Sequence, residues 1–195
     1  RPDFISIRDA ISYRDEILRI RGRAKLSGTV SLRRAYTKRM ATEPHAALAE
    51  LIRTHRQATL AVVEAGQPYT AMVSYVEAPD LSGILIHLSS LSAHKRMLLG
   101  NPVCSLLICE PDDGRAEVMS LARVNVQGRA ALIERAGADY PQAKARFLAK
   151  LPSAALMFSL PDFDLFRITP QRARYVAGFG RAFDVSDWSV MSAGA

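Results

Sequence analysis

One short segment of the chain combines hydroxyl, imidazole and cationic side chains. The run 83–100 is apolar as far as Leu88, which predicts a strand, and a helix is expected to begin near Ser92. After the apolar run come three serines and three basic residues: Ser89, Ser90, Ser92, His94, Lys95 and Arg96. Hydroxyl donors, free amides at a helix start and nearby cations are the groups that bind a phosphate monoester. The segment predicts an anion site, with ordinary solvated residues of a helix start as the alternative.

The residues around this segment predict the sheet that positions it. Apolar runs of strand length cover residues 58–64, 69–77, 83–88, 103–110, 119–133, 163–169 and 174–179. Helices are expected at 43–55, 92–99 and 140–151, and the apolar segment 153–160 is expected to pack on the sheet. Because the strands follow one another mostly without helices, we expect a mainly β fold with flanking helices, in which an antiparallel sheet closes into a barrel. Gly128 suits a bulge where a long strand bends.

Charge is unevenly distributed along the chain. Residues 1–39 hold 11 Lys and Arg against four Asp and Glu, which accounts for the whole formal net charge of +7. We therefore expect a mobile basic N-terminal extension over residues 1–39, a globular domain over 40–184 and a C-terminal tail over 185–195. Because the globular part has no net charge, nucleic-acid binding is not expected of it.

Other classes of protein lack support in the sequence. No segment has the roughly 18–20 uncharged apolar residues that a membrane span needs. The CxxC and HxxxH spacings of metal sites do not occur. Cys104 and Cys109 lie in one predicted strand, about 16 Å apart at about 3.3 Å per residue, which is too far for a disulfide. Reduced thiols and the lack of a span predict a cytoplasmic protein.

Six motifs occur in order between residues 43 and 184: Gln67–Tyr75, Leu88–His94, Asn101–Leu107, Ala122–Ala130, Asp162–Phe166 and Tyr175–Ala182. Together they resemble the FMN-binding split-barrel superfamily, whose members are similar to pyridoxamine 5'-phosphate oxidase, and in particular its haem-utilisation (HugZ-like) branch. The resemblance implies an antiparallel split β-barrel that forms a homodimer, with an FMN in each of two grooves at the subunit interface.

The resemblance also implies a set of cofactor-binding residues: Ala71, Met72, Val73, Ser74, Ser89, Leu91, His94, Lys95 and Arg123. The first four would lie along the isoalloxazine ring. Ser89 and Leu91 would meet the ribityl-phosphate end, and His94 and Lys95 would hold the phosphate. Arg123 would reach the flavin or its phosphate. No residue stands out as an obligatory acid or base, so no catalytic residue is assigned.

Three functions follow as hypotheses. The first is an FMN-dependent oxidoreductase, in which the cofactor supplies the electron chemistry. The second is a haem-binding or haem-degrading protein on the same scaffold, with His87 or His94 as the iron ligand. The third is a binding module without a cofactor. For His87, which lies in an apolar strand, a hydrogen-bonded structural role is the favoured expectation, and Asp162 and Asp164 are expected to cap a turn.

Overall fold

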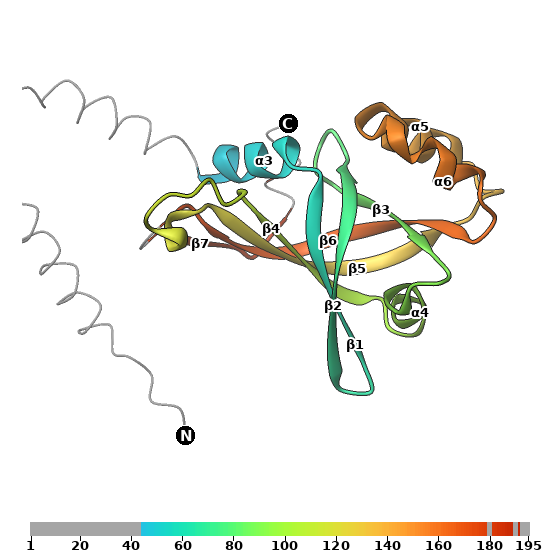
Figure 1. Ribbon diagram of the computed structural model, residues 1–195, viewed down its shortest axis with the longest axis horizontal. Coiled ribbons are helices and arrows are strands. Elements are labelled where there is room, and N and C mark those ends of the chain that lie inside the picture. The colour runs from blue at the N-terminus through green and yellow to red at the C-terminus, as the bar shows by residue number, and fades with distance from the viewer. Residues whose placement is uncertain (1–43, 179–180, 189–190, 192–195) are drawn as a thin grey trace, which may run out of the picture. The chain divides into compact units, whose positions relative to one another are not determined.

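The computed structural model describes residues 44–178, 181–188 and 191. The extension predicted over residues 1–39 lies outside the described residues. The elements in chain order are α3 Pro44–Thr54, β1 Gln57–Glu64, β2 Gln67–Glu77, β3 Ile84–Ser89, α4 Ala93–Gly100, β4 Val103–Cys109, the 3-10 turn η1 Val118–Ser120, β5 Arg123–Ile133, α5 Tyr140–Lys150, η2 Pro152–Ala154, α6 Ala155–Ser159, β6 Phe163–Val176 and β7 Ala182–Val185 (Figure 1).

Six antiparallel strands close into a barrel. The strand order is β3-β2-β1-β4-β5-β6, and β3 pairs again with β6 through the register Ile84↔Ile168 to Ser89↔Phe163. The second half of β6 pairs instead with β7, through Ala173↔Val185 to Val176↔Ala182. One edge of β6 is therefore shared between β3 and β7, and the barrel splits there. The predicted fold, a mainly β antiparallel split barrel with flanking helices, is confirmed.

A two-residue loop, Ala65 and Gly66, joins β1 to β2. Ala65 and Gly66 have positive φ angles of 49° and 80°, and they join Glu64 directly to Gln67 across the turn. Two successive positive φ angles give a turn whose twist matches that of the flanking strands. The strands predicted over residues 58–64 and 69–77 therefore form an antiparallel hairpin.

The predicted strands 163–169 and 174–179 are one continuous strand, and this part of the prediction was wrong. The two apolar runs were predicted as separate strands, and between them lies Pro170, which has no N–H to donate to a ladder. In the structure Pro170 pairs with Gly128, at the point where the register of β5 against β6 shifts between Gln127 and Gly128. Such a bulge is one of the few places where a sheet tolerates proline, so the strand passes through it. The bulge predicted at Gly128 is confirmed.

Two groups of buried side chains hold the domain together. The larger fills the barrel and includes Leu60, Ile86 and Leu106, each with no exposed surface. It also includes Trp188, whose Nε1 donates to the Leu81 carbonyl at 2.8 Å, so the segment after β7 completes the core. The smaller group lies where α5 and α6 cover the outside of β3 and β6, and there Phe158 is 4% exposed. The predicted packing of residues 153–160 on the sheet is confirmed.

No helix among the described residues is both long and apolar enough to cross a lipid bilayer.

Candidate functional site

Hydrogen bonds connect the loop between β3 and α4 to Asp162, just before β6. The Ser89 hydroxyl donates to Asp162 Oδ2 at 2.7 Å, and the Ser90 amide and hydroxyl both donate to the Asp162 carbonyl. Ser92, the residue before α4, donates its hydroxyl to the Ser89 carbonyl rather than capping the helix. The serines that suggested an anion site therefore use their hydroxyls to close the loop.

Lys95 is buried inside this loop. Its residue is 4% exposed, and Nζ lies 2.7 Å from Asp164 Oδ2. The same ammonium donates to Ser90 Oγ at 2.6 Å and to the Asp162 carbonyl at 2.9 Å. Three donors and three acceptors satisfy the charge without a ligand. Asp162 and Asp164 thus do more than cap a turn: they hold Lys95 in place and put two carboxylates beside Ser89.

The side chain of His94 has different surroundings from that of Lys95. Its ring is partly buried and stacks on Tyr69 of β2, with ring centroids 6.4 Å apart and planes at 24°. Burial lowers the pKa of His94 below its ordinary value, so the neutral imidazole predominates at neutral pH. In the described part of the chain no hydrogen bond engages its ring nitrogens. A neutral imidazole with free nitrogens is the form that binds transition metals.

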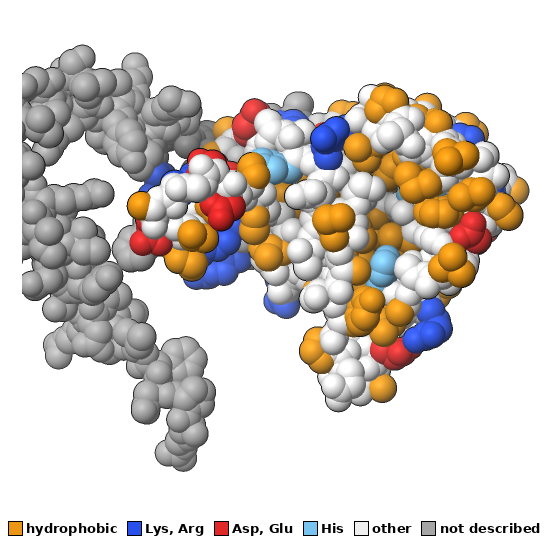
Figure 2. Space-filling model, viewed as in Figure 1, with side chains coloured by type: hydrophobic (Ala, Val, Ile, Leu, Met, Phe, Trp, Pro, Cys, Tyr) orange, Lys and Arg blue, Asp and Glu red, His pale blue; other side chains and the backbone are white. Residues whose placement is uncertain are grey.

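Hydrophobic side chains extend outward from His94. Figure 2 shows them gathered with a histidine over α4 and the adjacent strands. The exposed members are Tyr69 at 40%, Leu91 at 94% and Leu99 at 57%. Met72, at 77%, lies three residues from Tyr69 in β2 and points to the opposite face of that strand. Beside them Arg96 is exposed and pairs with Glu64 at 3.4 Å. The surface therefore offers an apolar area, an imidazole and a guanidinium together.

The strand predicted to lie along a flavin alternates in and out of the barrel. Val73 is 5% exposed and belongs to the core, whereas Met72 and Ser74 face outward and Ala71 is partly buried. Of these four, only Met72 and Ser74 present their side chains to the outer face.

Arg123 lies away from the loop before α4. It begins β5 opposite Cys109, whereas α4 leads through Pro102 into Val103, which pairs with Arg129. Six residues of strand separate the two pairs, or about 20 Å at roughly 3.3 Å per residue. The Arg123 guanidinium donates to the carbonyls of Met119 and Leu121 and so closes η1. The structure thus brings Ser89 and Lys95 together and leaves Arg123 apart from them.

His87 is buried in an aromatic cage. Its ring stacks on Phe158 with centroids 3.9 Å apart, and the Phe163 and Phe147 rings lie 5.1 and 5.9 Å away. Neither ring nitrogen has a hydrogen-bond partner in the described structure. The expectation of a hydrogen-bonded histidine was therefore wrong, because the residues that surround it from α5, α6 and β6 are apolar. Burial, followed by the charge of Arg135, lowers the pKa of His87 to about 4.

The sequence interpretation missed two contributors to this region. Tyr69 stacks on His94, and Asp164 pairs with Lys95. The motif Asp162-Phe-Asp164 was visible as two carboxylates on one side of a strand, but its partners lie in a segment far away in sequence. No group of three or more potential metal-ligating His, Cys, Asp or Glu side chains forms among the described residues.

The family comparison matches most of the described domain. Residues 44–177 match the family model for pyridoxamine 5'-phosphate oxidase. The matched region runs from α3 to the end of β6, so it contains the whole barrel.

Two curated relatives are named as haem oxygenases. The chain is 36% identical over 118 residues to the chloroplastic non-canonical haem oxygenase HOZ of Arabidopsis thaliana, covering 60% of this chain and 34% of that protein. It is 29% identical over 129 residues to the haem oxygenase HutZ of Vibrio cholerae, covering 65% and 72%. The chain thus spans about a third of the first relative and less than three quarters of the second.

A solved structure agrees with these relatives. A haem-binding protein from Mycobacterium smegmatis superposes with a TM-score of 0.65 at 27% identity, covering 74% of this chain and 60% of that one. The resemblance to the haem-utilisation branch is confirmed by these matches. With the family model spanning the barrel, the chain belongs to the pyridoxamine 5'-phosphate oxidase family.

Proposed function

We propose that this protein binds haem on the outer surface of its split barrel, with His94 as the iron ligand. The observation that carries the proposal is the neutral His94 imidazole within the apolar surface over α4, whose ring nitrogens make no hydrogen bond with the described residues. The names of both curated relatives and of the Mycobacterium smegmatis structure support the choice of haem.

The chemistry of the surface suits haem. Its macrocycle is a flat apolar ring with two carboxylates at one edge, and iron binds neutral imidazole. Tyr69, Leu91 and Leu99 offer apolar contact, and exposed Arg96 offers a guanidinium for a carboxylate. Bound haem would supply a redox-active iron. The chain would supply the imidazole, the apolar contact and the cation.

His94 is a better ligand candidate than His87. Phe158 covers the face of the His87 ring, and Phe147 and Phe163 flank it. An iron atom could approach the His87 nitrogens only if α6 were displaced. The His94 ring lies at the surface and needs no such change.

Binding of FMN, the main sequence prediction, has weaker support. Its phosphate would be held by Lys95, whose ammonium is already paired with Asp164. Asp162 and Asp164 would also place two carboxylates near the incoming phosphate, and like charges repel. A Lys95→Ala protein that still binds FMN as tightly as the wild type would exclude Lys95 as the phosphate ligand.

Absorbance titration with haemin tests the haem proposal. The full chain should develop a Soret band that saturates near one haem per chain. His94→Gln should weaken the affinity by roughly tenfold or more, because the coordinate bond to iron is lost. The matched control is His55→Gln, at the end of α3, which should bind like the wild type. Undiminished binding and an unchanged band in His94→Gln would contradict His94 as the ligand.

We extend the proposal to haem degradation, because both curated relatives are named as haem oxygenases. The test is the loss of the Soret band when ascorbate and dioxygen are added to the haem complex. A complex whose band persists, while free haemin bleaches as usual, would limit the function to haem binding.

The homodimer also remains a proposal, and its interface would be the outer face of the sheet. Met72, Thr59, Leu107 and Asn125 form one row across β2, β1, β4 and β5. Met72 is 77% exposed and Leu107 is 37% exposed, so the row presents apolar side chains to solvent. A second copy of the chain would bury them.

A further inference from the structure

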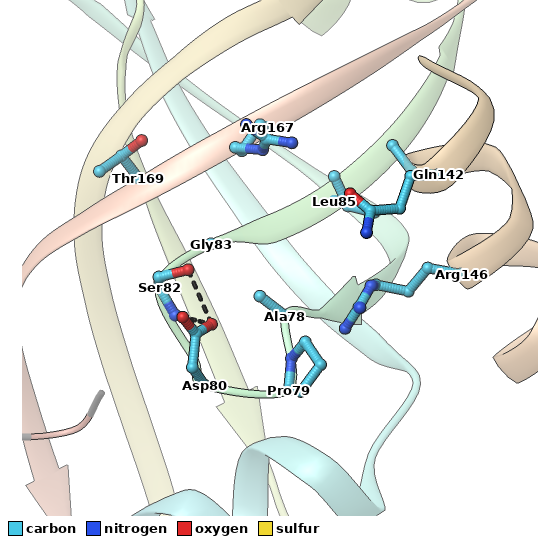
Figure 3. A pocket seen from close by; sticks show the side chains of 11 residues that line it. Ala78, Pro79, Asp80, Ser82, Gly83, Leu85, Gln142, Arg146, Arg167 and Thr169 are labelled. Atoms are coloured by element: carbon cyan, nitrogen blue, oxygen red, sulfur yellow. Dashed lines mark hydrogen bonds between the residues drawn. The ribbon is translucent and has the colours of Figure 1, made fainter. Parts of the chain in front are cut away.

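A second concave site lies at the other end of β2 from His94. It is an open pocket of about 640 Å³ between the loop that joins β2 to β3, the middle of β6 and the first turns of α5 (Figure 3). None of the cofactor-binding residues inferred from the sequence lines it. A volume of this size is in the range of sites for small molecules.

Two arginines from different elements face this pocket. Arg146 comes from α5 and Arg167 from β6. Arg167 donates to Asp139 at 3.2 Å, near the start of α5, in an exposed ion pair. Arg146 makes no hydrogen bond or ion pair with the described part of the chain, although its charge acts on Asp80. With Asp139 paired to Arg167 and Asp80 in the lining, the local charges balance, and Arg146 is the guanidinium that faces the pocket without such a pair among the described residues.

The carboxylate of Asp80 already accepts hydrogen bonds from Ser82. Its Oδ1 accepts from the Ser82 hydroxyl at 2.7 Å and from the Ser82 amide at 3.1 Å. These hydrogen bonds, more than the charge of Arg146, hold the pKa of Asp80 below its ordinary value. Because Asp80 is turned toward Ser82, it does not neutralise the arginines by direct contact.

The loop wall of the pocket is fixed before any ligand arrives. The Ala78 amide donates to the Gly83 carbonyl at 2.7 Å and closes the loop. Leu81, at a positive φ of 59° and 1% exposed, is held by Trp188 Nε1 on its carbonyl. Arg53 of α3 donates to the Pro79 carbonyl at 3.1 Å. A wall held from three sides loses little conformational freedom when it binds a ligand.

Gly83 sets the position of Arg167. A Cβ atom at Gly83 would lie 3.2 Å from Arg167 Cγ and 3.4 Å from Cδ. The arginine stem therefore lies directly on the glycine backbone, and its guanidinium extends from there toward α5 (Figure 3). Leu85 and Ala143 give the lining of the pocket an apolar part.

We propose that this two-arginine pocket binds a small organic oxyanion, a molecule with a carboxylate or phosphate group on a compact apolar body. The planar guanidinium fork matches both head groups through paired hydrogen bonds. Leu85 and Ala143 take the apolar body, and Gln142 and Thr169 provide further polar contacts. The site is separate from the surface near His94, so the proposal of oxyanion binding does not depend on haem binding.

Nuclear magnetic resonance titration of the full isotope-labelled chain tests the proposal. The probes are phenyl phosphate, benzoate, inorganic phosphate and the uncharged benzyl alcohol. Phenyl phosphate or benzoate should shift the Ser82 and Gly83 amide signals and the Arg146 side-chain signal with saturation. The stronger of these two probes identifies the head group. Both should bind more tightly than benzyl alcohol, which lacks the charge, and phenyl phosphate more tightly than inorganic phosphate, which lacks the ring.

Variants connect the binding to the arginines. Arg146→Gln and Arg167→Gln should each weaken binding of the stronger probe by roughly tenfold, the loss expected for a charge-assisted hydrogen bond. Arg174→Gln removes the same charge from β6, where Arg174 pairs with Asp184 outside the pocket, and should bind like the wild type. Gly83→Ala should weaken binding by displacing the Arg167 stem. Equal binding of benzyl alcohol and phenyl phosphate, or wild-type affinity in both arginine variants, would overturn the proposal.

Discussion

Lys95 Nζ lies 2.7 Å from Asp164 Oδ2 and thereby ties α4 to the start of β6. The Lys95 side chain is 5% exposed and that of Asp164 is 31% exposed, so the cation is the more deeply buried partner. A buried ammonium without a counter-ion is costly, whereas an ion pair that is removed whole and replaced by apolar residues often costs little.

The first prediction follows from that asymmetry. Asp164→Asn should lower the free energy of unfolding by about 2–3 kcal/mol, because Lys95 loses its counter-ion while the partly exposed site still admits water. Lys95→Met combined with Asp164→Leu should be more stable than Asp164→Asn alone. Urea denaturation followed by circular dichroism measures both.

The exposed pair of Arg96 and Glu64 is the matched control for this experiment. Its side chains are 71% and 47% exposed. Arg96→Gln should change the free energy of unfolding by less than about 1 kcal/mol. An Asp164→Asn protein as stable as the wild type would show that Lys95 does not depend on this carboxylate.

The second prediction concerns pH. The pKa of His87 is lowered to about 4 by burial in the folded chain, whereas an unfolded histidine titrates near 6.5. Between these values the unfolded state binds a proton that the folded state does not. Stability should therefore fall as the pH drops from about 6.5 to 4, with a His87 contribution on the order of 3 kcal/mol.

His87→Leu isolates this contribution. Leucine has no nitrogen to leave without a hydrogen bond and cannot be protonated, so the variant should lose less stability than the wild type between pH 7 and pH 4.5. Thermal unfolding at several pH values measures the difference, with His45→Gln on α3 as control. If the stability of the wild type and of His87→Leu changes with pH in the same way, burial in the aromatic cage does not lower the pKa of His87.

The third prediction tests the bulge. A Cβ atom at Gly128 would lie 2.4 Å from the Thr169 carbonyl oxygen and 3.1 Å from Ile168 Cγ2. Gly128→Ala should therefore separate β5 from β6 and lower the melting temperature strongly, by an amount equivalent to about 3 kcal/mol or more. Gly100→Ala, at the end of α4, meets nothing within 4 Å and should be neutral or slightly stabilising. Equal melting temperatures for the two variants would show that the backbone of Thr169 does not lie so close to Gly128.

These examples show which parts of the fold the sequence could predict. Apolar runs of strand length predicted β1 to β5 and the closing barrel, because such a run is local to each strand. The run predicted over 119–133 began too early, since η1 Val118–Ser120 precedes β5 Arg123–Ile133. The continuity of β6 through Pro170 depends on its pairing with Gly128 in another strand. No local signal around Pro170 carries that information.

The candidate site shows the same limit. The sequence placed His94 and Lys95 side by side at the start of a helix, but it could not predict that Lys95 turns inward while His94 faces the surface. That difference depends on Asp164, a residue of β6 distant in sequence. The pocket between Arg146 and Arg167 escaped prediction for the same reason, because only the packing of α5 against β6 brings them together.

The fourth prediction concerns the oligomer. Light scattering should give a mass of twice the 21.4 kDa chain. Met72→Glu places a charge on the outer row of the sheet and should produce a monomer. Leu156→Glu changes a comparably exposed residue on α6, 73% exposed, and should leave the mass unchanged. A wild-type monomer at micromolar concentration would remove the proposed interface.

The fifth prediction compares two cofactors on one preparation of the full chain, and it tests the central claim, that the protein binds haem, most directly. Separate titrations with haemin and FMN, each followed by gel filtration, show which chromophore elutes with the protein. The account predicts a Soret band that elutes with the chain and no retained flavin absorbance. The reason is that Lys95 is paired with Asp164, whereas the His94 ring nitrogens make no hydrogen bond with the described part of the chain. Retained flavin bands together with unbound haemin would contradict it.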